Sequence, residues 1–120
     1  MANRYRSGLE RRIAGELTSA SCDFEYETVK LPWYSQHKYT PDFLILSNGI
    51  HIETKGFFKP CDRSKHLKVR EANPSIDIRF CFQNAYNKLN KNSKTTYGDW
   101  CDKHDFLWCH KVVPKHWLEE

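Results

Sequence analysis

Two carboxylates and a lysine lie close together in one short segment of the chain, YTPDFLILSNGIHIETKG, which spans residues 39–56. They are Asp42, Glu53 and Lys55. Carboxylate oxygens are preferred ligands of Mg²⁺, which also takes waters and phosphate oxygens, and Mn²⁺ is the expected substitute. An amine beside such an ion stabilises charge on a phosphate or orients the attacking water. The same residue types also fit a cross-strand salt bridge at a sheet edge, so two interpretations stand at this point.

The spacing of these residues predicts a β-hairpin that brings them together. Two apolar runs flank Ser-Asn-Gly at residues 47–49, and Asn-Gly is a strong hairpin signal. With Asn-Gly as a two-residue turn, Asp42 lies opposite Lys55 and diagonal to Glu53, on one face of the sheet. A four-residue loop keeps the same parity, whereas a slip of one residue separates the three side chains.

Glu10 is a further candidate with two possible roles. It follows Ser7 by three residues, and S-x-x-E is a capping box that would begin an amphipathic helix over residues 7–20. A helix packed across the sheet would instead aim Glu10 at the same cluster as a third carboxylate. Two metal ions about 4 Å apart would then become feasible.

The remaining sequence predicts the elements that position this hairpin. A strand over residues 24–31 ends at Pro32, and a connection covers residues 32–38. After the hairpin the predicted elements are a helix over 62–72, a central strand over 76–82, a short helix from Thr96 to about His104, a strand over 106–113 and a helical turn over 114–120. This order predicts a single α/β domain over residues 1–120, with a mixed central sheet flanked by helices.

The composition fits a folded protein inside a cell. The hydrophobic fraction is 39% and the aromatic fraction 14%, which argues against a disordered chain. No stretch approaches the about 20 apolar residues of a membrane span, and the first residues lack the apolar centre of a secretory signal, so we expect an intracellular protein. Five cysteines, an odd number, are expected to be free thiols that mostly fill the core.

Positive charge is concentrated directly after the hairpin. Residues 55–70 contain six Lys or Arg residues against one acid, Asp62, in a chain of formal net charge +4. Such a segment suits a polyanion, because the start of a helix also binds phosphate through its free N–H groups. The residues predicted to contact a phosphate backbone are Lys59, Arg63, Lys65 and His66, with Arg4 and Arg6 ahead of the first helix. The alternative is a solvated surface.

A zinc site is not predicted. Cys101, His104, Cys109 and His110 have poor spacing for one, because the adjacent residues Cys109 and His110 of a strand would point to opposite faces. The four tryptophans are expected in the core or in an interface rather than as platforms for stacked bases.

Several motifs occur in an order and at a spacing that resemble a known family. They are RSGLE, FEYE, YTPDF, ETKG, DRSKHLKVRE followed by DIRF, and TTYGDWCDKH. Over nearly the whole chain they are similar to the phage T7 endonuclease I family of Holliday junction resolvases. The resemblance implies a PD-(D/E)xK restriction-endonuclease-like core and Mg²⁺-dependent hydrolysis of phosphodiester bonds in branched DNA, and it implies a phage protein acting in the host cytoplasm.

The resemblance also implies roles for the site residues. By position, Asp42 and Glu53 match the metal-binding carboxylates, and the Thr54 main-chain carbonyl completes the first site. Lys55 matches the catalytic lysine and Glu10 the additional carboxylate.

The family further implies an intertwined homodimer. Residues 1–31 would be exchanged with the partner across a bridge at 32–38, leaving residues 39–120 as the catalytic core. Glu10 would then act on the partner's site. The short bridge and trimmed termini keep open a site-specific nicking or homing endonuclease of the same fold. A non-catalytic DNA-binding module is a third possibility, although it would not need acids facing phosphate.

Overall fold

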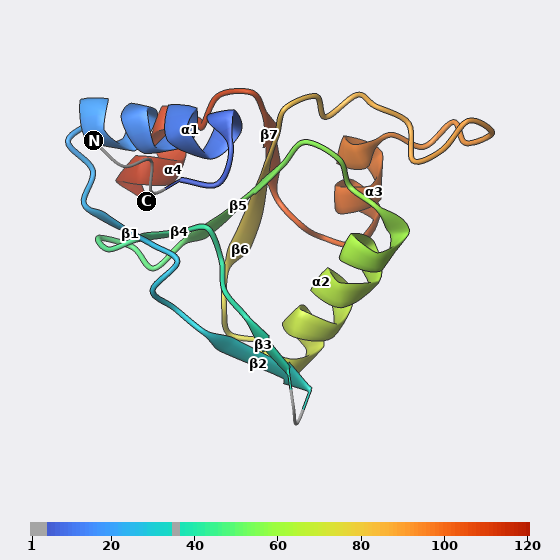
Figure 1. Ribbon diagram of the computed structural model, residues 1–120, viewed down its shortest axis with the longest axis horizontal. Coiled ribbons are helices and arrows are strands. Elements are labelled where there is room, and N and C mark those ends of the chain that lie inside the picture. Colours follow the sequence, from blue (N-terminus) through green and yellow to red (C-terminus); the bar gives the residue numbers. More distant parts are fainter. Residues whose placement is uncertain (1–4, 35–36) are drawn as a thin grey trace.

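The computed structural model describes residues 5–34 and 37–120 and shows a sheet with helices on both faces (Figure 1). The helices are α1 (Gly8–Ser19), α2 (Pro60–Ala72), α3 (Tyr97–Lys103) and α4 (Lys115–Glu119). The strands are β1 (Phe24–Tyr26), β2 (Leu31–Tyr34), β3 (His37–Tyr39), β4 (Phe43–Ile45), β5 (His51–Lys55), β6 (Ile78–Phe82) and β7 (Trp108–His110). The predicted mixed α/β class is confirmed. Among the described residues, no helix has the length and apolar character needed to span a membrane.

The main sheet contains five strands in the order β1-β4-β5-β6-β7. β4 runs antiparallel to both β1 and β5, whereas β5, β6 and β7 are parallel. As a result β1, β5, β6 and β7 all end where β4 begins. We call this end of the sheet the β5 carboxyl end. It is where the candidate site lies.

The predicted hairpin is confirmed, and of the two loop lengths left open by the sequence it has the four-residue one. Phe43 pairs with Ile52 and Leu44 with His51. Gly49 lies in the loop with φ +78, a backbone conformation that favours glycine, and its N–H donates to the Ile45 carbonyl at 2.9 Å. This register differs from that of the two-residue turn by two residues. It therefore keeps the parity on which the site depends.

The strand predicted over residues 24–31 is wrong in extent. Glu27 adopts φ +54, which ends the extended conformation and separates β1 from β2. Pro32 lies within β2 rather than ending it. In the part of the chain that the structure describes, β2 pairs with β3 alone, so the missing N–H of Pro32 can face outward. The predicted connection over 32–38 thus contains most of a second, two-stranded sheet.

The other predicted elements are confirmed with small shifts in their bounds. Helix α2 begins two residues earlier than predicted because Pro60 occupies its first turn, where a missing N–H costs nothing, and it ends before Asn73. Helix α3 follows Thr96, whose side-chain oxygen accepts a hydrogen bond from the Asp99 N–H at 3.1 Å. Strand β6 lies between β5 and β7 and is buried along its whole length, as predicted for a central strand.

Two aromatic and aliphatic clusters cover the two faces of the main sheet. On one face α1 and α4 pack against β4 and β5, and Ile13 and Leu17 of α1 are fully buried. On the other face Phe80 and Phe82 of β6 pack with Phe58 and residues of α3. All five cysteines are free, as predicted, and three of them are buried. This packing holds the β5 carboxyl end between α1 and α2.

A close contact in α3 allows a stability prediction. A Cβ added to Gly98 would lie 2.6 Å from the ring of Trp108, whose Nε1 is held by Asp102. Gly98→Ala should therefore lower the free energy of unfolding by roughly 1 to 3 kcal/mol, despite the better helix propensity of alanine. The matched control is Gly15→Ala in α1, which meets nothing within 4 Å and should raise it by about 0.5 to 1 kcal/mol. Urea unfolding followed by tryptophan fluorescence gives both values, and equal effects would contradict this assignment.

Candidate active site

Carboxylates from three elements meet at the β5 carboxyl end of the sheet. Asp42 precedes β4, Glu53 belongs to β5, and Glu10 lies in the first turn of α1. All three are buried, with 6 to 8% of their surface exposed. They line a cavity of about 510 Å³ whose other walls include Arg6, Glu27, Lys30, Tyr39, Thr40 and Lys65. The structure thus brings together the acids that the sequence singled out.

Asp42 is fixed by the strand opposite it. Its Oδ2 accepts hydrogen bonds from the Thr54 N–H at 2.9 Å and from the Thr54 hydroxyl at 2.7 Å. Burial, followed by the charge of Glu53, raises the pKa of Asp42 from its ordinary value of 3.8 to about 8. A carboxylate held in place this way favours a cation beside it.

Glu53 and Lys55 lie on the face of β5 that α2 covers, as the alternation predicted. The Tyr39 hydroxyl donates to Glu53 Oε1 at 2.6 Å, and Lys55 Nζ lies 3.4 Å from Glu53 Oε2. Lys55 Nζ is also 3.8 Å from Asp62 Oδ1 at the start of α2. Burial raises the pKa of Glu53, and the charge of Lys55 opposes that rise. The lysine is therefore held between two carboxylates.

The sequence predicted Asp42 on the same face as Glu53 and Lys55, but its carboxylate turns to Thr54. Asp42 precedes β4, and its carboxylate bonds to Thr54, the residue between them. Its position is therefore at the end of the sheet, between the face under α1 and the face under α2. This position is what lets Asp42 meet a carboxylate from α1.

The backbone of Glu10 belongs to the helix cap, and its side chain lines the cavity. Its N–H donates to Ser7 Oγ at 3.1 Å, which confirms the helix cap. Its carboxylate does not return to Ser7; Oε1 accepts from the Arg6 N–H at 3.0 Å and from the Tyr26 hydroxyl. Burial and this bond to Glu10 raise the pKa of Tyr26. Glu10 is thereby aimed at the cavity.

Glu27 is a member of the site that the sequence analysis missed. Its φ of +54 turns the chain back after β1, and its N–H donates to the Asp42 carbonyl at 3.1 Å. Its carboxylate pairs with Arg6 at 3.1 Å. The FEYE motif gave a partial signal, but the periodicity of a continuous strand placed Glu27 at an ordinary surface position.

One group of side chains in the described part of the chain is close enough to hold a metal ion. Carboxylate oxygens of Glu10, Glu27 and Asp42 all lie within 4.8 Å of one another. Oxygen donors of this kind, crowded and partly buried, fit a hard divalent cation such as Mg²⁺ or Mn²⁺.

The residues predicted to contact phosphate have different surroundings. Arg6 is exposed and paired with Glu27, and Lys65 lines the cavity with its ammonium 5.1 Å from the Tyr39 ring centre. Lys59 is exposed, whereas the Arg63 guanidinium donates to the Phe58 carbonyl. Arg4 lies outside the described residues.

His66 is not at the surface. It is 1% exposed and packs edge-on against Tyr39 and Phe80, so a direct phosphate contact does not fit its position. Among the described residues neither ring nitrogen has a hydrogen-bond partner, and Nε2 lies 3.8 Å from Glu53 Oε2. Burial, with Lys55 and Lys65 nearby, holds the pKa of His66 well below its ordinary value. His66 therefore backs Glu53 from inside the core as a neutral ring.

The raised pKa of Asp42 predicts a pH-dependent stability. Folding takes up a proton between pH 4 and about 8, so this carboxylate makes the metal-free protein less stable as pH rises through that window. The difference in free energy of unfolding between Asp42→Asn and wild type should grow with pH by up to about 1.4 kcal/mol per unit. His51 and His66 have lowered pKa values, so they make the protein more stable as pH rises toward the ordinary pKa of histidine. Both histidines are present in wild type and variant, so their contributions cancel in this difference. Urea unfolding in chelator checks it, and a constant difference would contradict it.

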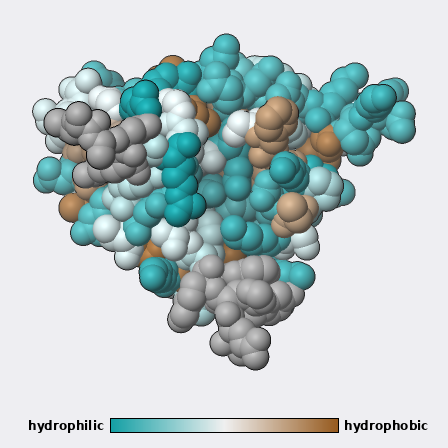
Figure 2. All heavy atoms as spheres, viewed as in Figure 1, coloured by the Kyte–Doolittle hydropathy of each residue, from teal (hydrophilic) through white to brown (hydrophobic). Residues whose placement is uncertain are grey.

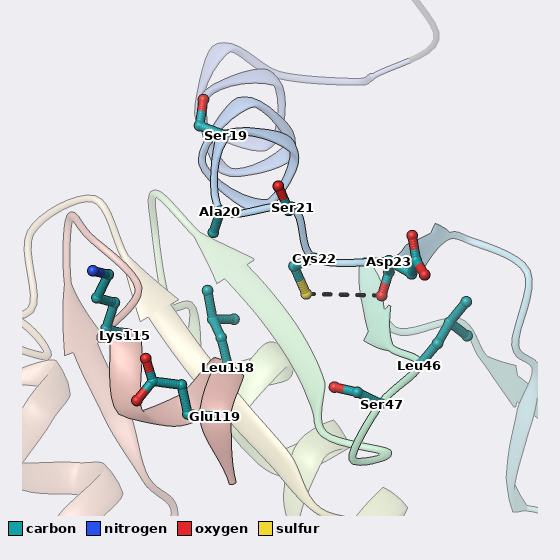
Figure 3. A pocket seen from close by; sticks show the side chains of 10 residues that line it. All are labelled: Ser19, Ala20, Ser21, Cys22, Asp23, Leu46, Ser47, Lys115, Leu118 and Glu119. Carbon is teal, nitrogen blue, oxygen red and sulfur yellow. Dashed lines mark hydrogen bonds between the residues drawn. The ribbon is translucent and has the colours of Figure 1, made fainter.

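A larger cavity, of about 700 Å³, lies away from these acids. Figure 3 shows its lining by the end of α1, the β4–β5 loop and α4. Its charged residues, Asp23, Lys115 and Glu119, are exposed, and none of the predicted site residues lines it. Volume alone therefore does not identify the site in this protein.

Comparison with known proteins agrees with the resemblance carried by the sequence motifs. A family model described as phage endonuclease I matches residues 1–120. Similar proteins include endonuclease I of Escherichia phage T7 and endodeoxyribonuclease 1 of Enterobacteria phage T3. Each is 46% identical over 119 residues, which cover 97% of this chain and 79% and 78% of the two relatives, respectively. The chain therefore belongs to the phage endonuclease I family.

Proposed function

We propose that this protein is a metal-dependent, structure-selective endodeoxyribonuclease that hydrolyses phosphodiester bonds in branched DNA, such as four-way junctions. The observation that carries the proposal is the meeting of Asp42, Glu53, Lys55 and Glu10 at one end of the sheet, in a member of an endonuclease family. We also propose that the fold has a PD-(D/E)xK nuclease core. This part of the proposal rests on the order of Asp42, Glu53 and Lys55 across the hairpin.

The cation proposed for this site is Mg²⁺, with Mn²⁺ as a substitute. Asp42, Glu10 and Glu27 would hold it, with Glu53 and the Thr54 carbonyl as further ligands. When bound, a divalent ion would stabilise negative charge on a phosphoryl oxygen and lower the pKa of a coordinated water. The fit rests on the crowding of the carboxylates and on the raised pKa of Asp42, which a cation would bring down.

The chain's own residues prepare the site for a phosphate. Glu53 and Asp62 hold the Lys55 ammonium, whose side chain is 13% exposed, at the end of β5. From there it stabilises negative charge that develops on the phosphate. Tyr39 fixes the orientation of Glu53 through its hydroxyl. Arg6, Lys59, Arg63 and Lys65 are proposed to bind the backbone near the scissile bond, which positions DNA without reading its sequence.

We further propose a homodimer. A four-way junction has two-fold symmetry, and two active sites related by a two-fold axis would match it. Residues 1–31 would be exchanged across the bridge at 32–38. The contacts that Glu10 makes with the site within one chain would then form with the partner's residues 39–120. Mixing Glu10→Ala and Asp42→Asn proteins after joint unfolding and refolding tests this directly. In an exchanged dimer one site of each mixed pair keeps both acids, so a substantial part of the activity should return. No recovery would place Glu10 and Asp42 of one chain in the same site.

One assay tests the function itself. The protein is incubated with Mg²⁺ and equal amounts of a synthetic four-way junction, a linear duplex and phage genomic DNA. Paired cuts near the branch are expected. Cutting at one defined genomic sequence would instead favour a homing or nicking enzyme, and binding without any cleavage would leave a DNA-binding module.

A further inference from the structure

A group of exposed lysines lies beside the candidate active site. The segments that follow the three parallel strands β5, β6 and β7 are residues 56–59, 83–95 and 111–113. These segments contain no Asp or Glu. Their exposed lysines, which we call the lysine surface, are Lys59, Lys88, Lys91, Lys94 and Lys111.

Backbone contacts hold the three segments side by side at the β5 carboxyl end. The Gln83 N–H donates to the Lys55 carbonyl at 2.9 Å, which joins the second segment to the candidate catalytic lysine. The Lys111 N–H donates to the Phe82 carbonyl at 2.8 Å, and the Ala85 N–H donates to His110 Nδ1 at 3.1 Å. The three segments therefore start side by side, and the second of them starts next to Lys55.

The longest of these segments has a defined shape. Figure 1 shows it as a loop that extends away from the body of the protein beyond α3. The Leu89 N–H donates to the Thr95 carbonyl and the Tyr97 N–H to the Asn87 carbonyl, both at 2.9 Å, and Lys88 pairs with Thr96 as an isolated bridge. These bonds close the base of the loop. Its lysines are thus displayed beyond the sheet.

The charge of this surface is not neutralised within the described part of the chain. None of the five lysines forms an ion pair there, whereas Lys55 lies close to two carboxylates. The acids nearest in sequence have other roles, because Asp62 pairs with Lys55 and Asp99 caps α3. Figure 2 shows a largely hydrophilic face around this end of the molecule. Unpaired cations of one sign favour a polyanion as their partner.

We propose that the lysine surface binds the phosphate backbone of the DNA arm that leads away from the scissile bond. This inference rests on the proposed nuclease function. Acids and lysines have separate roles at the β5 carboxyl end. The acids near β1, β4 and β5 bind the metal at the scissile phosphate, and the lysines after β5, β6 and β7 bind the flanking duplex. Such contacts release counterions and do not depend on sequence.

The test measures junction binding over a range of salt concentrations. Asp42→Asn serves as the parent, because it is expected to bind without cutting. The triple variant Lys88→Ala, Lys91→Ala and Lys94→Ala should reduce the slope of log K against log salt by roughly 2 to 3 for a junction with long arms. With arms too short to reach the loop, parent and triple variant should bind alike.

The matched control removes the same charge elsewhere on the surface. Arg11, Lys103 and Lys115 are exposed and lie outside both the acid cluster and the lysine surface, so changing all three to alanine should leave the slope near that of the parent. Equal slopes for the two triple variants would overturn the inference, while cleavage by wild type would still support the proposed function. A parent that does not bind junctions would contradict both.

Discussion

Asp42→Asn should slow the cleavage of a four-way junction by about a thousandfold, which corresponds to about 4 kcal/mol of transition-state stabilisation. Asparagine has nearly the same size and still offers an oxygen to Thr54, so the local fold should persist. What is lost is the charge that would hold the cation together with Glu10 and Glu27. Single-turnover cleavage at saturating Mg²⁺ gives the rate, and a gel-shift titration shows whether binding is retained.

The control for this variant is Asp23→Asn, the same chemical change at an exposed residue in the larger cavity. It should cut at the wild-type rate. In the absence of metal, Asp42→Asn should be more stable than wild type near pH 8, because it removes a buried carboxylate beside Glu53. A variant that is both more stable and inactive separates loss of chemistry from loss of folding. Wild-type cleavage by Asp42→Asn would contradict its assignment.

Lys55→Met should lower the rate of cleavage by about 10² to 10³-fold, the range found when one preorganised charged or polar donor is removed. Methionine keeps most of the apolar stem, and the ammonium that lies 3.4 Å from Glu53 is removed. The dissociation constant for the junction should change little, since one phosphate contact among several is lost. Quenched-flow or manual single-turnover assays report the rate.

The control for the lysine is Lys103→Met, at an exposed position in the last turn of α3. Its rate should be that of wild type. A fall in junction affinity as large as the fall in rate would show that Lys55 binds the ground state rather than the transition state. The double variant of Lys55→Met and Asp42→Asn should cut only a little more slowly than the slower of the two single variants, because the two residues act as one unit.

The hairpin and its acids could be predicted because they depend on local rules. Strand alternation and an Asn-Gly signal are enough to bring Glu53 and Lys55 to one face and Asp42 to the strand end. The two loop lengths left open by the sequence differ by two residues in register, so both of them keep this arrangement. Glu10 was identifiable for a similar reason, because its distance from Ser7 fixed it in the first turn of a helix.

The errors arose where contacts distant in sequence decide the outcome. The positive φ of Glu27 depends on a bond to the carbonyl of Asp42, which the pattern FEYETVKL does not encode. His66 was expected on a basic surface, but it lies on the buried face of α2. There it packs against Tyr39 and Phe80, which belong to two strands distant from it in sequence. Pro32 suggested the end of a strand, yet β2 has a free side on which proline is tolerated.

The grouping of lysines after β5, β6 and β7 was also beyond sequence analysis. Each segment alone looks like an ordinary connection between two elements, and the parallel order of the strands is what brings their ends together. Residues 83–95 lie in the connection between β6 and α3. Its place beside Lys55 follows from the register of β5 with β6.

Asp42, Glu10 and Glu27, with Glu53 beside them, are proposed to form a divalent-cation site next to Lys55. The most direct measurement is an anomalous difference map from crystals of the wild-type protein grown with Mn²⁺. We expect a peak within coordination distance of the Asp42 carboxylate, and no peak in crystals of Asp42→Asn grown under the same conditions. A map with no peak among these carboxylates at saturating Mn²⁺, from protein that cuts junctions in the same buffer, would contradict it.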